Sequence, residues 1–115
     1  MRLLICGDRD YNHAAWVGYT IDHLAPTMVI EGEARGADTI ARQEAERRDI
    51  PVLRFPADWR KFGRAAGPIR NQQMLDEGEP DLVIAFHDDI CHSAGTADML
   101  CRAEDAGIPY TLITR

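Results

Sequence analysis

The sequence predicts a doubly wound α/β protein, a three-layer α/β/α sandwich around a five-stranded parallel sheet. Short apolar runs suited to buried strands alternate with stretches of helical spacing along the 115 residues. In addition, glycine-containing loops at 6–10, 31–38 and 93–98 each lie at or shortly after the end of an apolar run. Loops that follow parallel strands share one edge of the sheet, and ligands of such proteins bind at that edge.

Five apolar runs have the length and composition of buried strands. They are Leu3–Cys6, Met28–Ile30, Val52–Phe55, Leu82–Phe86 and Tyr110–Ile113. Because strands separated by helices join through right-handed crossovers, we expect a parallel sheet. The expected strand order is 3-2-1-4-5, which puts the switch point between the first and fourth strands.

Four helices are expected between these strands, because apolar residues recur there at helical spacing. They cover residues 14–24, a segment with Ala37, Ile40, Ala41 and Ala45 on one side, residues 68–78 and residues 95–105. The fixed φ of Pro68 suits the first position of the third helix, and Gly107 ends the fourth.

Composition limits the class of protein and its partners. The chain is long enough for one domain, residues 1–115, that folds without disulfides or metal. The formal net charge of −6 argues against nucleic acid as a partner, because nonspecific affinity for it comes from cationic side chains. No stretch resembles a signal peptide, and the longest apolar run, Leu82–Phe86, is too short to span a membrane. We therefore expect a cytoplasmic protein with no membrane partner.

Three cysteines without the spacing of a disulfide framework predict reduced thiols. Cys6 and Cys101 occupy apolar-patterned positions and are expected in the core, whereas Cys91 lies in a polar loop. The segment 87–92 contains histidine, aspartate and cysteine, which are metal-ligating types. Adjacent Cys91 and His92 match no structural zinc spacing, so we expect neither a metal nor a cofactor.

Side chains suited to an anionic ligand gather in and beside the glycine loops. The predicted ligand-binding residues are Gly7, Arg9, Gly32, Arg35, Gly36, Arg64, Arg70, Asn71, Ser93, Gly95 and Thr96. Arginine grips a phosphate with two parallel hydrogen bonds, and a helix start capped by Ser93 offers further donors. The alternative is that the arginines are solvated and that the glycines only permit turns. The joint occurrence of these loops at strand ends favours the ligand.

The segment 58–71 is longer than an ordinary connection between a strand and a helix, and long loops in compact domains are usually functional. Two arginines, Asn71 and Trp59 surround a Gly-Pro helix start in this segment. This composition suits an anionic group and a stacked base, although Trp59 could also cover the edge of the core.

Several phrases in this order resemble the SLOG superfamily, specifically its small stand-alone members from bacteria and phages. They are Gly7-Asp8-Arg9-Asp10-Tyr11, Ala34-Arg35-Gly36-Ala37-Asp38, Ala57-Asp58-Trp59, Gly63-Arg64-Ala65-Ala66-Gly67-Pro68-Ile69-Arg70-Asn71 and Gly95-Thr96-Ala97-Asp98. The resemblance extends to the DNA-processing protein A family and the Lonely Guy phosphoribohydrolases. It implies a Rossmann-like fold, a nucleotide or ADP-ribose-like ligand and a homo-oligomer.

The resemblance leaves two functions open, a binding module that senses a nucleotide and an enzyme that hydrolyses its N-glycosidic bond. Asp38 and Asp98 are the candidate catalytic carboxylates, with Asp98 at the place of an acidic residue in the Lonely Guy motif. Alternatively, both only stabilise the helix starts that they occupy. His92-Ser93-Ala94 replaces the first glycines of that motif, which favours the binding module. Binding of single-stranded DNA is a third function, disfavoured by the acidic charge.

Overall fold

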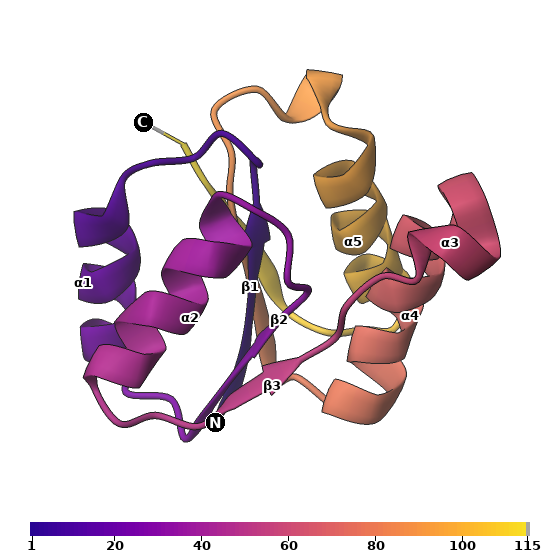
Figure 1. Cartoon of the computed structure of the whole chain (residues 1–115). Helices are drawn as coiled ribbons and strands as arrows, with labels where there is room; N and C mark the ends of the chain where they lie inside the picture. The colour runs from indigo at the N-terminus through magenta and orange to yellow at the C-terminus, as the bar shows by residue number, and fades with distance from the viewer. Residues whose placement is uncertain (115) are drawn as a thin grey trace.

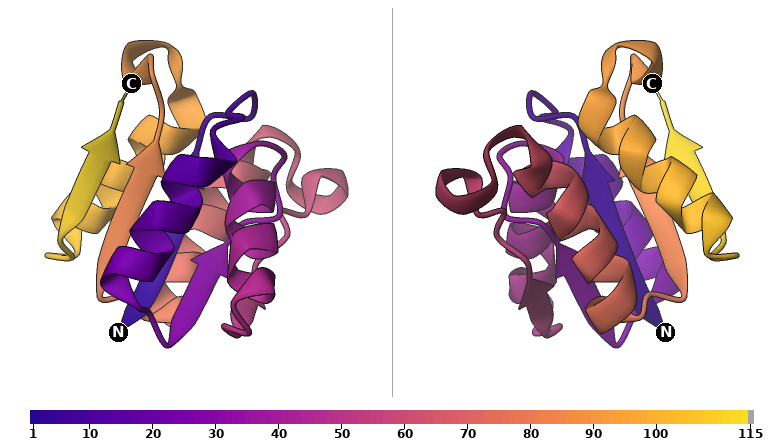
Figure 2. Two further views of the ribbon diagram at one scale, coloured as in Figure 1. Left: turned by 90° about the vertical axis from the view of Figure 1, so that its left-hand side faces the viewer. Right: turned by 90° about the vertical axis from the view of Figure 1, so that its right-hand side faces the viewer.

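The computed structural model describes residues 1–114 and contains a five-stranded parallel sheet. Its strands are β1 (Arg2–Gly7), β2 (Met28–Glu31), β3 (Val52–Arg54), β4 (Leu82–Phe86) and β5 (Tyr110–Ile113). The order β3-β2-β1-β4-β5 confirms the predicted topology, and every neighbouring pair is parallel. All carboxyl ends of the strands therefore lie at one edge, the upper one in Figure 2.

Helices cover both faces of the sheet and complete the predicted three layers. They are α1 (Ala14–Leu24), α2 (Ala37–Arg47), the single-turn α3 (Trp59–Phe62), α4 (Ala66–Gly78) and α5 (Ala94–Asp105), with 3-10 turns η1 (Gly63–Ala65) and η2 (Ile90–His92). Figure 1 shows α1 and α2 on one face of the sheet and α4 and α5 on the other.

The central strand β1 is buried on both faces because its side chains alternate between two cores. Leu3 and Ile5 pack into the core beneath α1 and α2, whereas Leu4 and Cys6 pack into the core beneath α4 and α5. Period-two alternation with both sides covered explains why the run from Leu3 to Cys6 is apolar throughout.

Two local expectations are wrong. Helix α4 begins at Ala66, ahead of Pro68, because the first turn of a helix tolerates a residue without an N–H. Cys101 is exposed and is not a core residue. Met99 and Ala103 of α5 pack into the core, and Cys101, two positions after Met99, therefore lies on the opposite side of the helix.

Replacing Gly36 with alanine should destabilise the fold by about 3 kcal/mol, because a Cβ would add a clash to an unfavourable backbone conformation. Gly36 has φ 75° and ψ −124°, and a Cβ there would lie 2.2 Å from the carbonyl oxygen of Asp8. Gly107 is the matched control, since it has φ 72° but nothing within 4 Å of a Cβ. Gly107→Ala should cost only about 1 kcal/mol. Urea unfolding measures both, and equal losses would contradict the clash.

Candidate functional site

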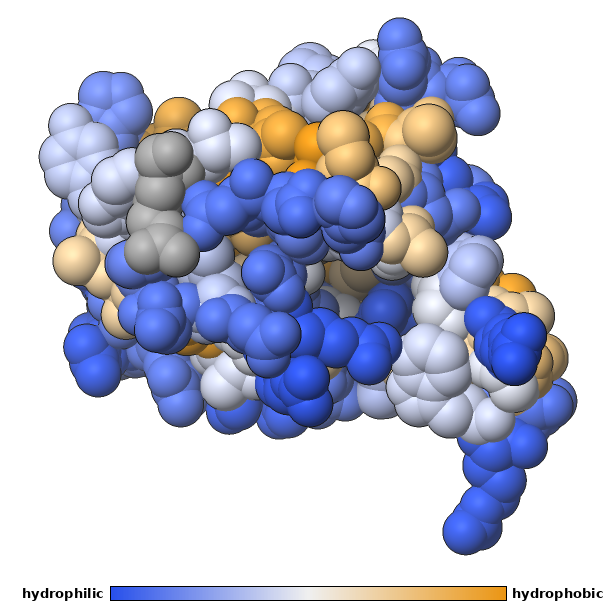
Figure 3. All heavy atoms as spheres, turned by 90° about the horizontal axis from the view of Figure 1, so that it is seen from above, coloured by the Kyte–Doolittle hydropathy of each residue, from blue (hydrophilic) through white to orange (hydrophobic). Residues whose placement is uncertain are grey.

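A cavity of about 530 Å³ opens at the carboxyl edge of the sheet, where the chain leaves β1 and β4. The structure brings most of the predicted site residues together around it, namely Gly7, Arg9, Arg35, Asp38, Arg64, Arg70, Asn71, Ser93, Gly95 and Thr96. Figure 3 looks down on this edge and shows a surface dominated by hydrophilic residues. The volume is within the range of small-molecule sites, and the position is the switch point expected for ligands of this fold.

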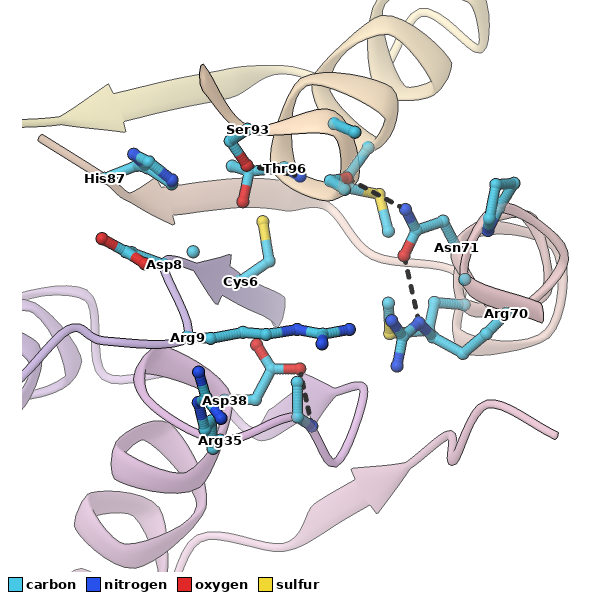
Figure 4. A pocket seen from close by; sticks show the side chains of 18 of the residues that line it. Cys6, Asp8, Arg9, Arg35, Asp38, Arg70, Asn71, His87, Ser93 and Thr96 are labelled. Atoms are coloured by element: carbon cyan, nitrogen blue, oxygen red, sulfur yellow. Dashed lines mark hydrogen bonds between the residues drawn. The ribbon is translucent and has the colours of Figure 1, made fainter. Parts of the chain in front are cut away.

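Asp38 is a buried carboxylate in the first turn of α2 that also lines the cavity. Its Oδ2 atom accepts hydrogen bonds from the backbone N–H of Gly32 at 3.0 Å and of Ala34 at 3.3 Å. Burial raises the pKa of Asp38 from 3.8 to about 6, and these amides together with Arg70 and Arg9 oppose the rise. Figure 4 shows its carboxyl group beside the extended Arg9 side chain.

Arg70 and Asn71 of α4 connect the two sides of the cavity. Arg70 donates through Nη1 to the carbonyl oxygen of Gly32 and, at 3.1 Å, through Nε to Oδ1 of Asn71. The Nδ2 group of Asn71 donates to the carbonyl oxygen of Gly95 at 3.2 Å and to Oδ2 of Asp98 at 3.0 Å. Both N–H groups of the Asn71 amide are therefore used within the protein. This arrangement makes Asn71 a residue that positions Arg70 and the start of α5.

The amino end of α5 forms the wall opposite Arg9, as Figure 4 shows through Ser93 and Thr96. Ser93 is the N-cap, as predicted, and its Oγ accepts from the N–H of Thr96 at 3.2 Å. The preceding N–H groups, those of Ala94 and Gly95, belong to the first turn, whose amides have no partner within the helix. A Cβ on Gly95 would meet nothing within 4 Å. This wall therefore has the backbone geometry of an anion-binding helix start.

Arg9 and Arg35 are two of the exposed cations of the site, and Arg64 is the third. The guanidinium of Arg9 lies over the Trp59 ring, 5.6 Å from its centroid. Arg35 pairs with Asp10 at 3.4 Å, but both side chains are largely exposed, so the pair holds Arg35 only weakly. Both guanidinium groups can thus reorient toward an anion at little cost.

Three predicted residues lie outside the walls of this cavity among the described residues 1–114. Gly32 lines a neighbouring cavity and contributes both backbone groups to the contacts of Asp38 and Arg70. Gly36 lies against the backbone of Asp8 and Arg9. Asp98 accepts from Asn71 and, at 2.8 Å, from Nε of Arg102 on the next turn of α5. Its role as a catalytic residue stays a prediction.

The sequence reasoning missed Glu31, a fully buried acid at the end of β2. Burial raises its pKa from 4.5 to about 7, and a hydrogen bond from the N–H of Glu33 at 2.6 Å opposes the rise. Arg54 of β3 lies 3.6 Å from its Oε1. The only signal in the sequence is a glutamate that directly ends an apolar run and precedes a glycine.

Cys6 lies at the floor of the cavity, and burial raises the pKa of its thiol well above the ordinary value. The thiol is therefore protonated at neutral pH and is a poor nucleophile.

The polar loop after β4 is held by hydrogen bonds among its own residues. Nδ1 of His87 accepts from the N–H of Asp89 at 2.9 Å, and Nδ1 of His92 lies 2.7 Å from Oδ2 of Asp89. Within residues 1–114, no group of three or more His, Cys, Asp or Glu side chains is arranged to hold a metal ion.

Comparison of the sequence with known proteins shows the family of this chain. The model of the YspA, cpYpsA-related SLOG family (YAcAr) matches residues 1–62. A relative, "Gene 61 protein" of Mycobacterium phage D29, is 34% identical to this chain over an aligned length of 118. The alignment covers 94% of this chain and 92% of that protein. The chain belongs to the YspA, cpYpsA-related SLOG family. The resemblance seen in the sequence phrases is thereby confirmed.

The fold of this SLOG chain is similar to a solved structure, the X-ray structure of DNA processing protein A (DprA) from Streptococcus pneumoniae. The TM-score is 0.81 at 17% sequence identity, and the match covers 99% of this chain but only 50% of that one. The SLOG chain thus spans about half the length of DprA. None of the helices described in residues 1–114 is both long and apolar enough to cross a membrane.

The buried acid Glu31 predicts a pH dependence of stability. Because its pKa is raised from 4.5 to about 7 in the folded protein, the folded state holds the proton more tightly than the unfolded chain. Its contribution to stability is fully present below pH 4.5 and is lost as the pH rises through about 7. Relative to Glu31→Gln, the free energy of unfolding of the wild type should fall by on the order of 2–3 kcal/mol over this range.

Urea unfolding between pH 4.5 and 8 measures this difference. Glu46→Gln is the matched control, because Glu46 is an exposed glutamate of α2 that pairs with Arg42 at 3.8 Å, away from Glu31. It should leave the wild-type slope in place. A Glu31→Gln variant with the wild-type slope would show that Glu31 is ionised throughout.

Proposed function

We propose that this chain binds a nucleotide or a nucleotide-derived, ADP-ribose-like ligand at the carboxyl edge of its sheet and acts as a sensor or binding module. One observation carries the proposal: the amino end of α5 faces the cations Arg9 and Arg70 across a cavity of about 530 Å³. Helix amides and guanidinium groups converging on one space suit a phosphate. Membership of the SLOG family favours a nucleotide-related ligand in general terms.

The carboxylates at the cavity suit the sugar of such a ligand. Asp38 and Asp8 both line the cavity near Arg9, and a carboxylate oxygen accepts from a ribose hydroxyl. With the phosphate at α5 and the hydroxyls at Asp38 or Asp8, the sugar would lie across the end of β1. The acidic charge of the chain, −6, argues against single-stranded DNA as an alternative ligand.

Self-association is part of the proposed sensor, which needs a way to report that the ligand is bound. Trp16 and Tyr19 of α1 are exposed large side chains, at 44% and 71% of their surface, on the face of the protein formed by α1 and α2. Native mass spectrometry of the protein with and without nucleotides reports the bound mass and the oligomer in one measurement.

Removing Arg70 or Arg35 should weaken nucleotide binding roughly 10- to 100-fold, since a hydrogen bond to a charged group contributes about 1.5–3 kcal/mol. Isothermal titration calorimetry of Arg70→Ala and Arg35→Ala with AMP and ADP-ribose measures the change. Arg47→Ala is the control, because Arg47 lies on α2 and pairs with Glu44 at 3.0 Å. Unchanged affinity in folded Arg70→Ala and Arg35→Ala would contradict the proposed phosphate site.

A second candidate function is hydrolysis of the N-glycosidic bond of a nucleotide. The observation that favours it is the raised pKa of Asp38, about 6, at the wall of the cavity. A carboxyl group that titrates near neutral pH can exchange a proton with an attacking water. Asp98 would support this chemistry through its hydrogen bond to Asn71.

If the chain is an enzyme, Asp38→Asn should lower kcat for release of the base by about 100-fold or more while nucleotide binding persists. Asp98→Asn should also reduce kcat, because it disturbs the contacts of Asn71 and Arg102. Chromatography of AMP incubated with each protein separates the free base from the nucleotide. Binding without any base release by the wild type would leave the sensor as the function.

A further inference from the structure

A second cavity, of about 480 Å³, adjoins the first above the ends of β2 and β3. The two cavities share the walls formed by Arg9, Ala34, Arg35, Trp59 and Arg70, so they meet at these side chains. The remaining walls of the second cavity are Gly32, Glu33, Pro56 and Ala57. Apolar side chains and one aromatic ring thus stand beside cations, and none of the steps assigned above uses this space.

The Trp59 indole is held at the junction of the two cavities while half of its surface stays open. Asp58 caps the single turn α3, accepting from the N–H of Lys61 at 3.0 Å. A Cβ on Gly67 would lie 3.3 Å from Cη2 of Trp59, so the edge of the indole rests on the backbone of α4. Trp59 is nevertheless 49% exposed. The ring is therefore fixed in place without being part of the core.

The half-exposed indole of Trp59 offers an aromatic surface on which planar groups can stack. The Arg9 guanidinium lies over the ring at 5.6 Å, which is the stacking that a flat, delocalised cation prefers. A nucleobase is also flat and stacks on tryptophan through its π-face. Glu33 also lines this cavity. Its Oε1 atom pairs with Arg54, and its other carboxylate oxygen can accept from an exocyclic amino group of a base.

We propose that the second cavity is a ring-binding subsite, in which Trp59 stacks on the nucleobase of the ligand whose phosphate lies at α5. This inference rests on the proposed nucleotide function. It assigns the phosphate to the first cavity, the sugar to the space beside Asp38 and the base to the space between Trp59 and Pro56. Trp59 is then the residue that makes the site prefer a nucleotide over a sugar phosphate.

Calorimetry with AMP and ribose 5-phosphate tests the subsite, because the two probes share the phosphate and the sugar and differ by the base. The wild type should bind AMP at least about 10-fold more tightly than ribose 5-phosphate, as expected for one stacked base. This ratio should fall toward 1 in Trp59→Ala and be largely retained in Trp59→Phe, which keeps an aromatic ring. Phe62→Ala is the matched control, since Phe62 is an aromatic residue of the same turn α3 that is similarly exposed, at 40%, but lies outside the walls of both cavities.

The outcomes separate this inference from the function on which it rests. A ratio that falls in Trp59→Ala alone supports the subsite. Equal affinity of the wild type for both probes, or a ratio that survives in Trp59→Ala, overturns the subsite and leaves the phosphate site standing. No binding of either probe by the wild type overturns both. Thermal melting of each variant confirms that it is folded. Should Trp59→Ala unfold, Trp59→Leu keeps the test decisive, because leucine retains apolar volume but has no aromatic face, so the ratio should fall toward 1 there too.

Discussion

Arg70 and Asn71 are the constraint on which the arrangement of the site depends. These neighbours on α4 bond in opposite directions, Arg70 to the carbonyl of Gly32 after β2 and Asn71 to the carbonyl of Gly95 at the start of α5. The hydrogen bond between their own side chains closes the connection. Loops from opposite halves of the sheet are thereby held at a fixed separation. The proposed phosphate site, made of a helix start and a guanidinium, would need that separation before the ligand arrives.

The same region holds charges that oppose folding. Burial raises the pKa values of both Glu31 and Asp38, so keeping these groups ionised at neutral pH costs stability. Buried acids with perturbed pKa values gather at functional sites more often than elsewhere, because a site needs groups whose charge a ligand can alter. A cation or hydrogen-bond donor on an arriving ligand would favour the ionised form of Asp38. Ligand binding and protonation at this edge should therefore be coupled.

The sequence predicted the strand order and the edge of the sheet at which the cavity opens, because both follow from patterns that are local in the chain. A continuous apolar run defines β1, and Ser93 before Gly95 marks the start of α5. The roles of individual polar residues could not be predicted in this way. Asn71 was expected to contact the ligand, yet its amide is used by groups 24 and 27 residues away. Burial of Glu31 likewise depends on packing between distant elements, and periodicity carries no information about it.

The arrangement of carboxylates favours binding over catalysis. Glycoside hydrolysis generally uses two carboxyl groups that flank the scissile bond. Asp38 lines the cavity, but Asp98 bonds to Asn71 and Arg102 and does not belong to the cavity wall within residues 1–114. Asp8 could take the second position, yet its backbone carbonyl accepts from the N–H of Ala37, next to Asp38, so both acids come from adjoining segments on one side of the cavity. Two acids on one side of a sugar can grip its hydroxyls, whereas flanking a glycosidic bond requires one on each side.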